Sequence, residues 1–193
     1  MPYEFRFYIN HELHFRAKLY SEQCTAQTEK GQACKRICCI GTPFCWTHLL
    51  FHRYLRIKQS TIPGAGKGLF AVAPKTDDIK QLVFYKNEKI IEYDGELMHH
   101  QELEKRYGRY TAPYGVVVNE KRDLYEDGAL QRGAGTLCNH ATGHKANARL
   151  GVSHSRIVLY ATRRIMNGEE IFVNYGARYK FNEPTEYSTT AVR

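Results

Sequence analysis

Two short stretches of the chain carry the residue types from which a reactive site can be built. Residues 137–141 join an amide, Asn139, to an imidazole, His140. In residues 169–176, Tyr175 follows a short apolar run and precedes a glycine. An amide offers both a donor and an acceptor, an imidazole can act as either, and a phenol can orient a reacting group through its oxygen. We therefore expect the two stretches to close one pocket.

Cysteines form a second group of residues that could carry chemistry. Five of the six lie within residues 24–45, namely Cys24, Cys34, Cys38, Cys39 and Cys45. The N-terminus lacks the apolar core of a signal peptide, so an intracellular protein with reduced thiols is expected. A disulfide framework is therefore disfavoured, and a metal site or a set of buried free thiols is the alternative.

Zinc takes four borderline or soft ligands in a tetrahedron. Cys24 and Cys34 flank an expected hairpin with Gly31 at its turn, and Cys45-x-x-His48 forms a ligand pair on a turn that enters a helix. The segment resembles small zinc-binding modules that are common in proteins of large DNA viruses and some protists. Matching that pattern assigns Zn²⁺ to Cys24, Cys34, Cys45 and His48.

Cys38 and Cys39 are left over by this assignment, and either could replace one of the four ligands. Four protein ligands leave no open coordination position, so the predicted role of the metal is structural or for docking rather than catalytic.

The glycine stretch 62–71 excludes two familiar phosphate-binding sites. Lys67 is followed by Gly68, so the hydroxyl that a P-loop needs is missing. Glycines at 64, 66 and 68 precede a strand-like run rather than a helix, which argues against a dinucleotide fingerprint. These glycines allow the backbone to approach a ligand closely, and a simple hairpin turn is the alternative.

The pattern of short apolar runs punctuated by glycine predicts a mostly β fold. Short helices are expected at 49–55 and 102–107, a loop at 123–134, strand character in 1–20, and a loose polar tail at the C-terminus. The expected division is an N-terminal segment 1–20, a zinc-binding module 21–52, a main domain 53–181 and a flexible tail 182–193.

The composition limits the classes of partner that the protein is expected to bind. The 193 residues are 42% hydrophobic and carry a formal charge of +8, which suggests affinity for a polyanion such as nucleic acid. A basic surface without such a partner is the alternative. No run approaches the roughly 18 apolar residues of a membrane span, so no membrane association is expected.

Taken in order, several short motifs resemble the SET domain family, whose members are protein-lysine methyltransferases that use S-adenosylmethionine. The motifs are Gly66 to Ala71, Tyr93 to Glu96, Asn139-His140, Asn147, Gly168 to Ile171 and Asn174 to Gly176. The resemblance covers roughly 53–181 and is to small, viral-type members. It implies a β-clip-like SET-domain fold with a C-terminal pseudo-knot, in which the two stretches described first lie side by side.

The resemblance also implies roles in cofactor binding. The backbone around Gly66, Lys67, Gly68 and Leu69 would cradle the methionine end of S-adenosylmethionine, and Asn139 and His140 would hold its amino group and adenine edge. Tyr179 or Phe181 would stack on the adenine.

Catalytic roles follow in the same way. Tyr175 would lie at the point of methyl transfer and also contact the cofactor, and Tyr114 and Tyr93 would wall the lysine channel. Leu150 and Val173 are wall positions that could limit the number of methyl groups added. Buried aromatic residues without a ligand role are the alternative reading of the tyrosines other than Tyr175 and of Phe181.

The chain departs from the family pattern at three places. Thr136 and Leu137 stand where many relatives have an arginine and an aromatic residue, and Asn174 stands where an aspartate is common. The cysteines that often follow the domain and build a second zinc site are absent. The tail after Tyr179 must then close the cofactor site without metal, or a partner must do so.

The function that the resemblance implies is methylation of a lysine in a histone tail or another basic nuclear protein. The expected location is the nucleus, which would be the host nucleus for a viral protein. A catalytically weak SET domain that binds chromatin or nucleic acid is the alternative. A thiol hydrolase built on Cys138 and His140 is disfavoured, because neighbours on a strand face opposite ways and no oriented third partner is evident.

Overall fold

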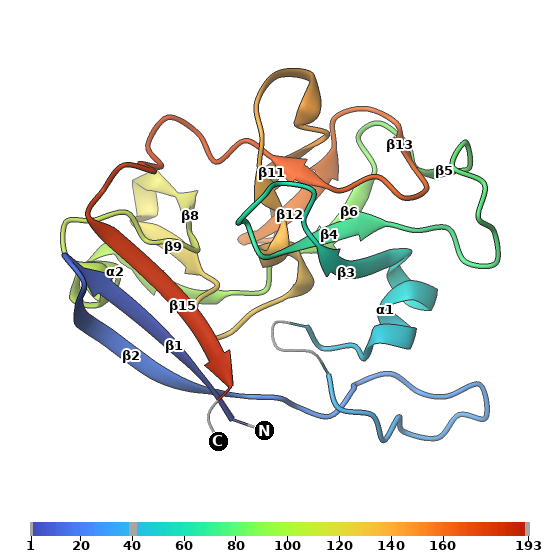
Figure 1. Cartoon of the computed structure of the whole chain (residues 1–193), viewed down its shortest axis with the longest axis horizontal. Coiled ribbons are helices and arrows are strands. Elements are labelled where there is room, and N and C mark those ends of the chain that lie inside the picture. Colours follow the sequence, from blue (N-terminus) through green and yellow to red (C-terminus); the bar gives the residue numbers. More distant parts are fainter. Residues whose placement is uncertain (1, 39–41, 192–193) are drawn as a thin grey trace.

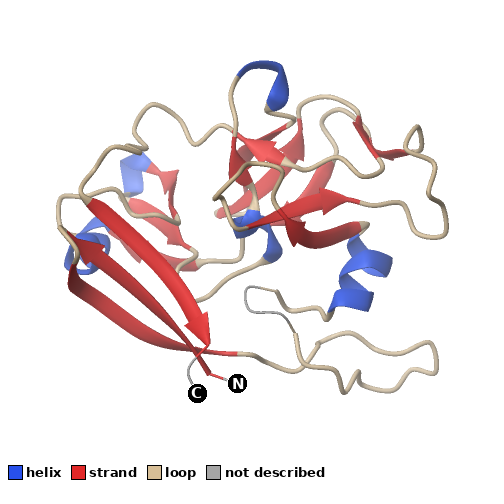
Figure 2. Ribbon diagram, viewed as in Figure 1, coloured by secondary structure: helices blue, strands red, loops and turns tan. Residues whose placement is uncertain are grey.

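The computed structural model describes residues 2–38 and 42–191. Strands dominate the described chain, and the helices between them are short (Figure 2). This confirms the mostly β fold that the glycine-punctuated apolar runs predict. No helix in the described residues is long and apolar enough to cross a membrane.

A three-stranded sheet joins the two ends of the chain, with strand order β15-β1-β2 (Figure 1). Its strands are β1 (Pro2–Ile9), β2 (Glu12–Tyr20) and β15 (Thr185–Ala191). β1 pairs with both neighbours in antiparallel register, and Phe7 lies opposite Tyr187 and Phe15. The expectation of a loose tail is therefore wrong for residues 185–191, because β1 offers them a ladder that local sequence does not reveal.

The central sheet brings together the two stretches expected to close a pocket. Its order is β10-β14-β11-β12-β6, built from β10 (Asn139–His140), β14 (Phe172–Val173), β11 (Ala148–Ser153), β12 (Arg156–Ala161) and β6 (Lys89–Glu92). β14 runs parallel to β10 on one side and to β11 on the other. Asn139 and Phe172 are direct neighbours across the ladder, although they are far apart in sequence.

Three smaller sheets surround this centre. They pair β3 (Leu55–Gln59) with β4 (Lys67–Ala71), β13 (Ile165–Met166) with β5 (Leu82–Phe84), and β7 (Glu96–His99) with β9 (Leu124–Asp127) and β8 (Gly115–Asn119). The expected loop at 123–134 is therefore wrong at 124–127, where Glu126 and Asp127 are fully buried in β9.

Buried hydrogen bonds explain this strand. Glu126 accepts the backbone N–H groups of Gly95 and Ile157 at 2.8 and 2.6 Å. Asp127 accepts the Tyr107 hydroxyl at 2.8 Å and the Arg106 guanidinium at 2.9 Å. Buried charges need such partners, and these are supplied by elements far away in sequence.

Two α-helices lie at the edges, α1 (Trp46–Arg53) and α2 (His100–Tyr107). Three 3₁₀ turns complete the described structure, at Glu120–Arg122, Ala134–Leu137 and Gly143–Lys145. The helices expected at 49–55 and 102–107 are confirmed, each starting two to three residues earlier than expected.

The apolar side chains form two main clusters. The larger one fills the space between the central sheet, β3–β4 and α1, with Leu55, Leu69 and Leu159 fully buried. The second lies between the terminal sheet and α2; it contains Phe5 and Phe7, and the ring of Phe7 packs against that of Tyr107. Odd-numbered residues of β1 face this cluster, as the period of two in a strand requires.

Candidate active site and metal cluster

Two cavities adjoin the parallel strands β10 and β14. The channel cavity, of about 550 Å³, lies between α2, β8 and the segment after β14. The loop cavity, of about 870 Å³, lies between the glycine stretch, β10 and the terminal sheet. Six residues line both, which makes them the boundary between the cavities: Thr111, Pro113, Tyr114, Thr136, Tyr175 and Tyr179.

Tyr175 is held at this boundary by hydrogen bonds from both of its ends. Its hydroxyl donates to the carbonyl of Cys138 at 2.8 Å, and its backbone N–H donates to Nδ1 of His140 at 3.1 Å. His140 therefore accepts through Nδ1, and its Nε2 carries the proton of the neutral ring. Burial raises the pKa of the Tyr175 phenol well above its ordinary value, so the group is a neutral phenol at physiological pH.

Asn139 connects the glycine stretch to Glu170, which lies just before β14. Its Nδ2 donates to the carbonyl of Lys67 at 3.0 Å and to Oε1 of Glu170 at 3.1 Å. Both amide protons are thus used, and Oδ1 makes no hydrogen bond within residues 2–38 and 42–191. Because Asn139 lines the loop cavity, this oxygen is available to accept a hydrogen bond from a bound ammonium group.

Glu170 is the anchor of the loop that precedes the glycine stretch. Its carboxylate accepts the hydroxyls of Ser60 and Thr61 at 2.7 and 2.6 Å and the backbone N–H of Thr61 at 2.7 Å. Burial raises the pKa of this carboxyl, but these hydrogen bonds lower it more, so its pKa lies below the ordinary value. Glu170 is ionised and ties the loop to β10.

The glycine stretch meets the loop cavity only in part. Gly66 and Lys67 line it, and Gly66 has a positive φ of 70° that favours glycine. Gly68 and Leu69 do not line it: Leu69 is fully buried in the core, and a Cβ at position 68 would collide with the Glu170 carboxylate. Glycine at 68 is therefore explained by the close approach of Glu170 rather than by a ligand.

The predicted channel walls gather around the channel cavity. Tyr93, Tyr114, Leu150 and Val173 all line it. The Tyr93 hydroxyl donates to the carbonyl of Tyr114 at 2.8 Å, which orients both residues. Burial raises the pKa of Tyr93, so these four side chains form an uncharged part of the cavity wall, although Arg178 also lines the cavity.

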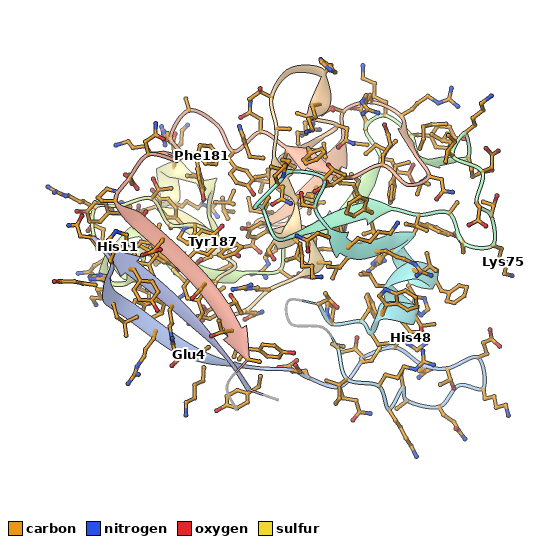
Figure 3. All side chains as sticks on the ribbon, in the orientation of Figure 1. Glu4, His11, His48, Lys75, Phe181 and Tyr187 are labelled. Carbon is orange, nitrogen blue, oxygen red and sulfur yellow. The ribbon has the colours of Figure 1, made fainter. Side chains whose placement is uncertain are left out.

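Phe181 and Tyr179 lie over the other side of His140. The ring of Phe181 lies 5.0 Å from the His140 ring and 4.7 Å from that of Tyr179. Phe181 is 61% exposed, and both residues line the loop cavity. Figure 3 shows Phe181 on the segment that leads into β15. Either ring could cover a planar ligand in this cavity.

The terminal sheet supplies a wall of the loop cavity that the sequence did not predict. Tyr3 and Phe7 from β1 and residues 185–189 from β15 all line it. No cysteine follows residue 138 in the given sequence, and on this side the cavity is lined by β1 and β15.

The four predicted zinc ligands come together in space. The ligand atoms of Cys24, Cys34, Cys45 and His48 all lie within 4.8 Å of one another. Nδ1 of His48 lies 3.3 Å from the sulfur of Cys24 and 3.4 Å from that of Cys45. A tetrahedral zinc site has ligand-to-ligand edges of about 3.4–3.8 Å, so the donor set and its spacing fit Zn²⁺. Gly31 has a positive φ of 74° at the predicted hairpin turn.

Of the two remaining cysteines, the structure describes only Cys38, and Cys38 does not belong to this ligand group. Cys38 is buried in the same small cluster, but it is not one of the four residues whose ligand atoms converge. Cys39 lies outside the described residues.

Glu170, Arg132 and Tyr187 are functional candidates that sequence reasoning missed. Glu170 had a signal, because a carboxylate stands directly before the buried run 171–173. Arg132 and Tyr187 had none, because their importance comes from contacts with Tyr114 across the fold.

Comparison with known proteins defines the class to which this fold and site belong. Residues 66–176 match the SET domain family. The match spans more than half of the chain, and the chain belongs to the SET domain family.

Two relatives share the domain. The chain is 31% identical over 131 residues to the histone-lysine N-methyltransferase EZH2 of Chaetomium thermophilum, a match that covers 63% of this chain and 8% of the relative. It is 28% identical over 130 residues to the N-lysine methyltransferase KMT5A-A of Danio rerio, covering 62% of this chain and 35% of the relative. The chain therefore spans well under half the length of either.

Solved structures agree on the fold. The polycomb repressive complex 2 of Chaetomium thermophilum superposes with a TM-score of 0.54 at 28% identity, over 68% of this chain and 16% of that one. The same complex in an autoinhibited conformation bound to S-adenosylmethionine gives 0.52 at 29% identity, over 66% of this chain and 16% of that one.

Proposed function

We propose that this chain is a protein-lysine N-methyltransferase that uses S-adenosylmethionine. The observation that carries the proposal is the boundary between the two cavities, where Tyr175 and Tyr114 face both. A methyl donor in the loop cavity and a lysine in the channel cavity would meet at this boundary. SET relatives named as lysine methyltransferases, and a solved relative bound to S-adenosylmethionine, support the same reading.

The residues of the loop cavity fit such a cofactor. Asn139 Oδ1 is a free acceptor for the amino group of its methionine end, with Gly66 and Lys67 as the adjoining backbone. His140 and Phe181 offer a ring edge and a ring face for the adenine. When bound, the cofactor supplies an electrophilic methyl group on a positively charged sulfur.

The channel cavity would prepare the lysine. A free lysine amine has a pKa of about 10.4 and is protonated at neutral pH, which blocks attack. Apolar walls such as Leu150 and Val173 disfavour the charged form, and a nearby sulfonium cation does so too. These walls would favour loss of the amine proton to solvent, and the neutral nitrogen could then bond to the methyl group that a bound cofactor would supply, with the S–C bonding electrons remaining on its sulfur.

Tyr175 would orient the amine in this step. Its proton is committed to the Cys138 carbonyl, so its oxygen lone pairs remain to accept an N–H of the amine. The raised pKa of its phenol means that it positions the amine without acting as a base. Alignment of this kind is a large part of the catalytic power available to a transfer reaction.

The substrate that we propose is a histone tail or another basic nuclear protein, which places the protein in a nucleus, that of the host if the chain is viral. Relatives named for histone lysines support this choice. The residues lining the channel include no carboxylate, so recognition would depend on the lysine stem and the peptide backbone rather than on flanking positive charges.

Nucleic acid is a second proposed partner, through a basic face on the zinc module and β3. Residues 21–70 contain seven Lys and Arg against two Glu. Trp46 is 52% exposed, and the Arg56 guanidinium lies 3.8 Å from its ring centroid. Arg36 donates to Thr47, next to Trp46, and Lys58 is on the same side of β3 as Arg56. The presence of Tyr175 at the boundary between the two cavities favours an enzyme over a domain that only binds chromatin or nucleic acid.

The test is methyl transfer from labelled S-adenosylmethionine to a panel of histones and basic peptides, read by mass spectrometry. We expect labelled lysine, and we expect Tyr175→Phe to lower kcat by at least about tenfold while leaving cofactor affinity nearly unchanged. Tyr160→Phe, on the Arg149 side of β12, is the matched control and should retain wild-type turnover. Cofactor binding without any labelled lysine would refute the enzyme, and equal loss of binding and turnover would refute the role of Tyr175.

A further inference from the structure

The ring of Tyr114 is contacted by two aromatic residues from outside the segment 66–176 that defines the family, and by Arg132 from within it. Phe5 of β1 contacts it edge-on at 6.2 Å between ring centroids, and Tyr187 of β15 does so at 5.4 Å. The Arg132 guanidinium lies 4.5 Å from the Tyr114 centroid. Two of these three contacts come from the terminal sheet, whose strands begin and end the described chain (Figure 1).

Phe5 is the centre of this arrangement. It is fully buried, and it contacts Tyr114, the ring of Tyr187 at 6.3 Å and the Arg132 guanidinium at 5.7 Å. It lines neither cavity, so it cannot touch a ligand in either. Its side chain instead reaches each group that touches Tyr114 from the side of the terminal sheet.

Arg132 connects the terminal sheet to the main domain by hydrogen bonds. Its Nε donates to the carbonyl of Ala129 at 3.0 Å, and its Nη2 donates to Oγ1 of Thr189 on β15 at 3.3 Å. In the register of the sheet, Thr189 lies directly opposite Phe5. Arg132 is therefore bonded to the terminal sheet at the position of Phe5, through the residue that pairs with Phe5 across the ladder.

We propose that Phe5 is a positioning residue of the methyl-transfer site, because it sets where Tyr114 and Tyr187 stand in the wall between the two cavities. The effect on turnover rests on the proposed function, whereas the placement of Tyr114 does not. Tyr114 borders the channel cavity, so its position determines the room beside the lysine amine. A smaller residue at position 5 lets the Tyr114 ring retreat, which misaligns the first transfer and leaves more space for methyl groups already added.

The competing explanation is that the hairpin β1–β2 only stabilises the fold. A substitution at Leu19 distinguishes this from a positioning role of Phe5. Leu19 is 5% exposed in the same hydrophobic cluster, but it lies on β2, one strand further from β15 than Phe5. Leu19→Ala removes apolar volume from the cluster without removing a ring that contacts Tyr114. It is therefore the matched control for Phe5→Leu.

The experiment uses the full chain with 3-fluorotyrosine at position 114. We expect Phe5→Leu to shift the 19F resonance of residue 114, and Leu19→Ala to leave it in place although both variants lower the melting temperature. Turnover of Phe5→Leu should fall about tenfold or more, because small misplacements of aligned groups are costly. Its products should move toward higher methylation, and those of Leu19→Ala should keep the wild-type ratio.

The outcomes keep the two proposals apart. A wild-type chain that transfers no methyl group refutes the proposed function, while the 19F comparison still tests the placement of Tyr114. An active wild type whose turnover and product ratio change equally in Phe5→Leu and Leu19→Ala refutes the positioning role. An unshifted 19F resonance in Phe5→Leu refutes it as well.

Discussion

Glu170 shows how a single carboxylate can organise a binding loop. It is 5% exposed and gathers donors from Ser60, Thr61 and Asn139. An ionised acceptor makes stronger hydrogen bonds than a neutral one, and removal of the acceptor leaves each buried donor unsatisfied. The residue thus couples the loop before the glycine stretch to the amide that faces the loop cavity.

Glu170→Gln should weaken both stability and cofactor binding. The amide places an N–H₂ group among donors, so we expect a loss of about 1–3 kcal/mol in the free energy of unfolding at pH 7. Glu169→Gln is the matched control: Glu169 pairs with Arg163 at 3.0 Å and accepts the Met166 N–H at 2.9 Å, a bond that the amide oxygen can retain, so the substitution should cost less than about 1 kcal/mol. Urea unfolding and calorimetry with S-adenosylhomocysteine measure both effects.

The pH dependence of this destabilisation has a definite sign. The pKa of Glu170 is lowered in the folded state, so its stabilisation is present above the ordinary value of 4.5 and disappears as pH falls through the folded pKa. The difference in unfolding free energy between wild type and Glu170→Gln should therefore shrink as pH falls below 4.5. A difference that grows on acidification would contradict the ionised anchor.

At the scale of elements, the metal cluster leads directly into the candidate active site. Cys45 is the residue before α1, and α1 buries Leu49 in the main core cluster. Tyr54 ends α1 in a left-handed conformation, with φ of 55°, and β3 follows at once. β3 pairs with β4, which begins at Lys67 on the edge of the loop cavity. Figure 3 shows His48 where α1 meets the projecting hairpin.

Zinc content tests this element. We expect about one zinc per chain, bound by four protein ligands. Cys34→Ser should lose the metal and lower the melting temperature, because metal binding supplies folding free energy to small sites. Cys38→Ser, in the same cluster, should keep the metal, as measured by elemental analysis. If Cys34→Ser keeps its zinc and Cys38→Ser loses it, Cys38 rather than Cys34 is the ligand.

For the whole molecule, the charge of +8 is unevenly spread. Residues 21–70 contain seven Lys and Arg against two Glu, and five of these cations form no ion pair within residues 2–38 and 42–191: Lys30, Lys35, Arg36, Arg56 and Lys58. Unpaired cations next to the exposed Trp46 suit a phosphate backbone with stacked bases.

Nucleic-acid binding should therefore depend on salt and on this face. We expect the variant Arg36→Gln, Arg56→Gln and Lys58→Gln to bind a fluorescent DNA duplex more weakly. Its salt slope should be smaller by roughly one for each phosphate that the replaced cations neutralise in the wild type. Replacing three exposed lysines on another surface, Lys75, Lys80 and Lys86, removes the same charge and is the control. Equal weakening in both variants would mean that net charge alone drives association.

The amino-acid sequence was sufficient for features that depend on local pattern and spacing. The four metal ligands, the mostly β fold, both short helices and the pairing of Asn139-His140 with Tyr175 follow from residue types in order, together with a family resemblance. Such features are visible because periodicity, turn residues and ligand spacing are properties of neighbouring positions.

Features that depend on long-range contacts are decided only in the folded chain. Residues 185–191 have the polar composition of a tail, yet they form β15 because β1 supplies their hydrogen-bonding partners. Residues 124–127 form a buried strand because Arg106 and Tyr107 satisfy Asp127. Phe5 reaches Tyr114 only because both chain ends fold onto one domain. Partners so distant along the chain leave no trace in local sequence, since they are selected by packing and by the satisfaction of buried polar groups.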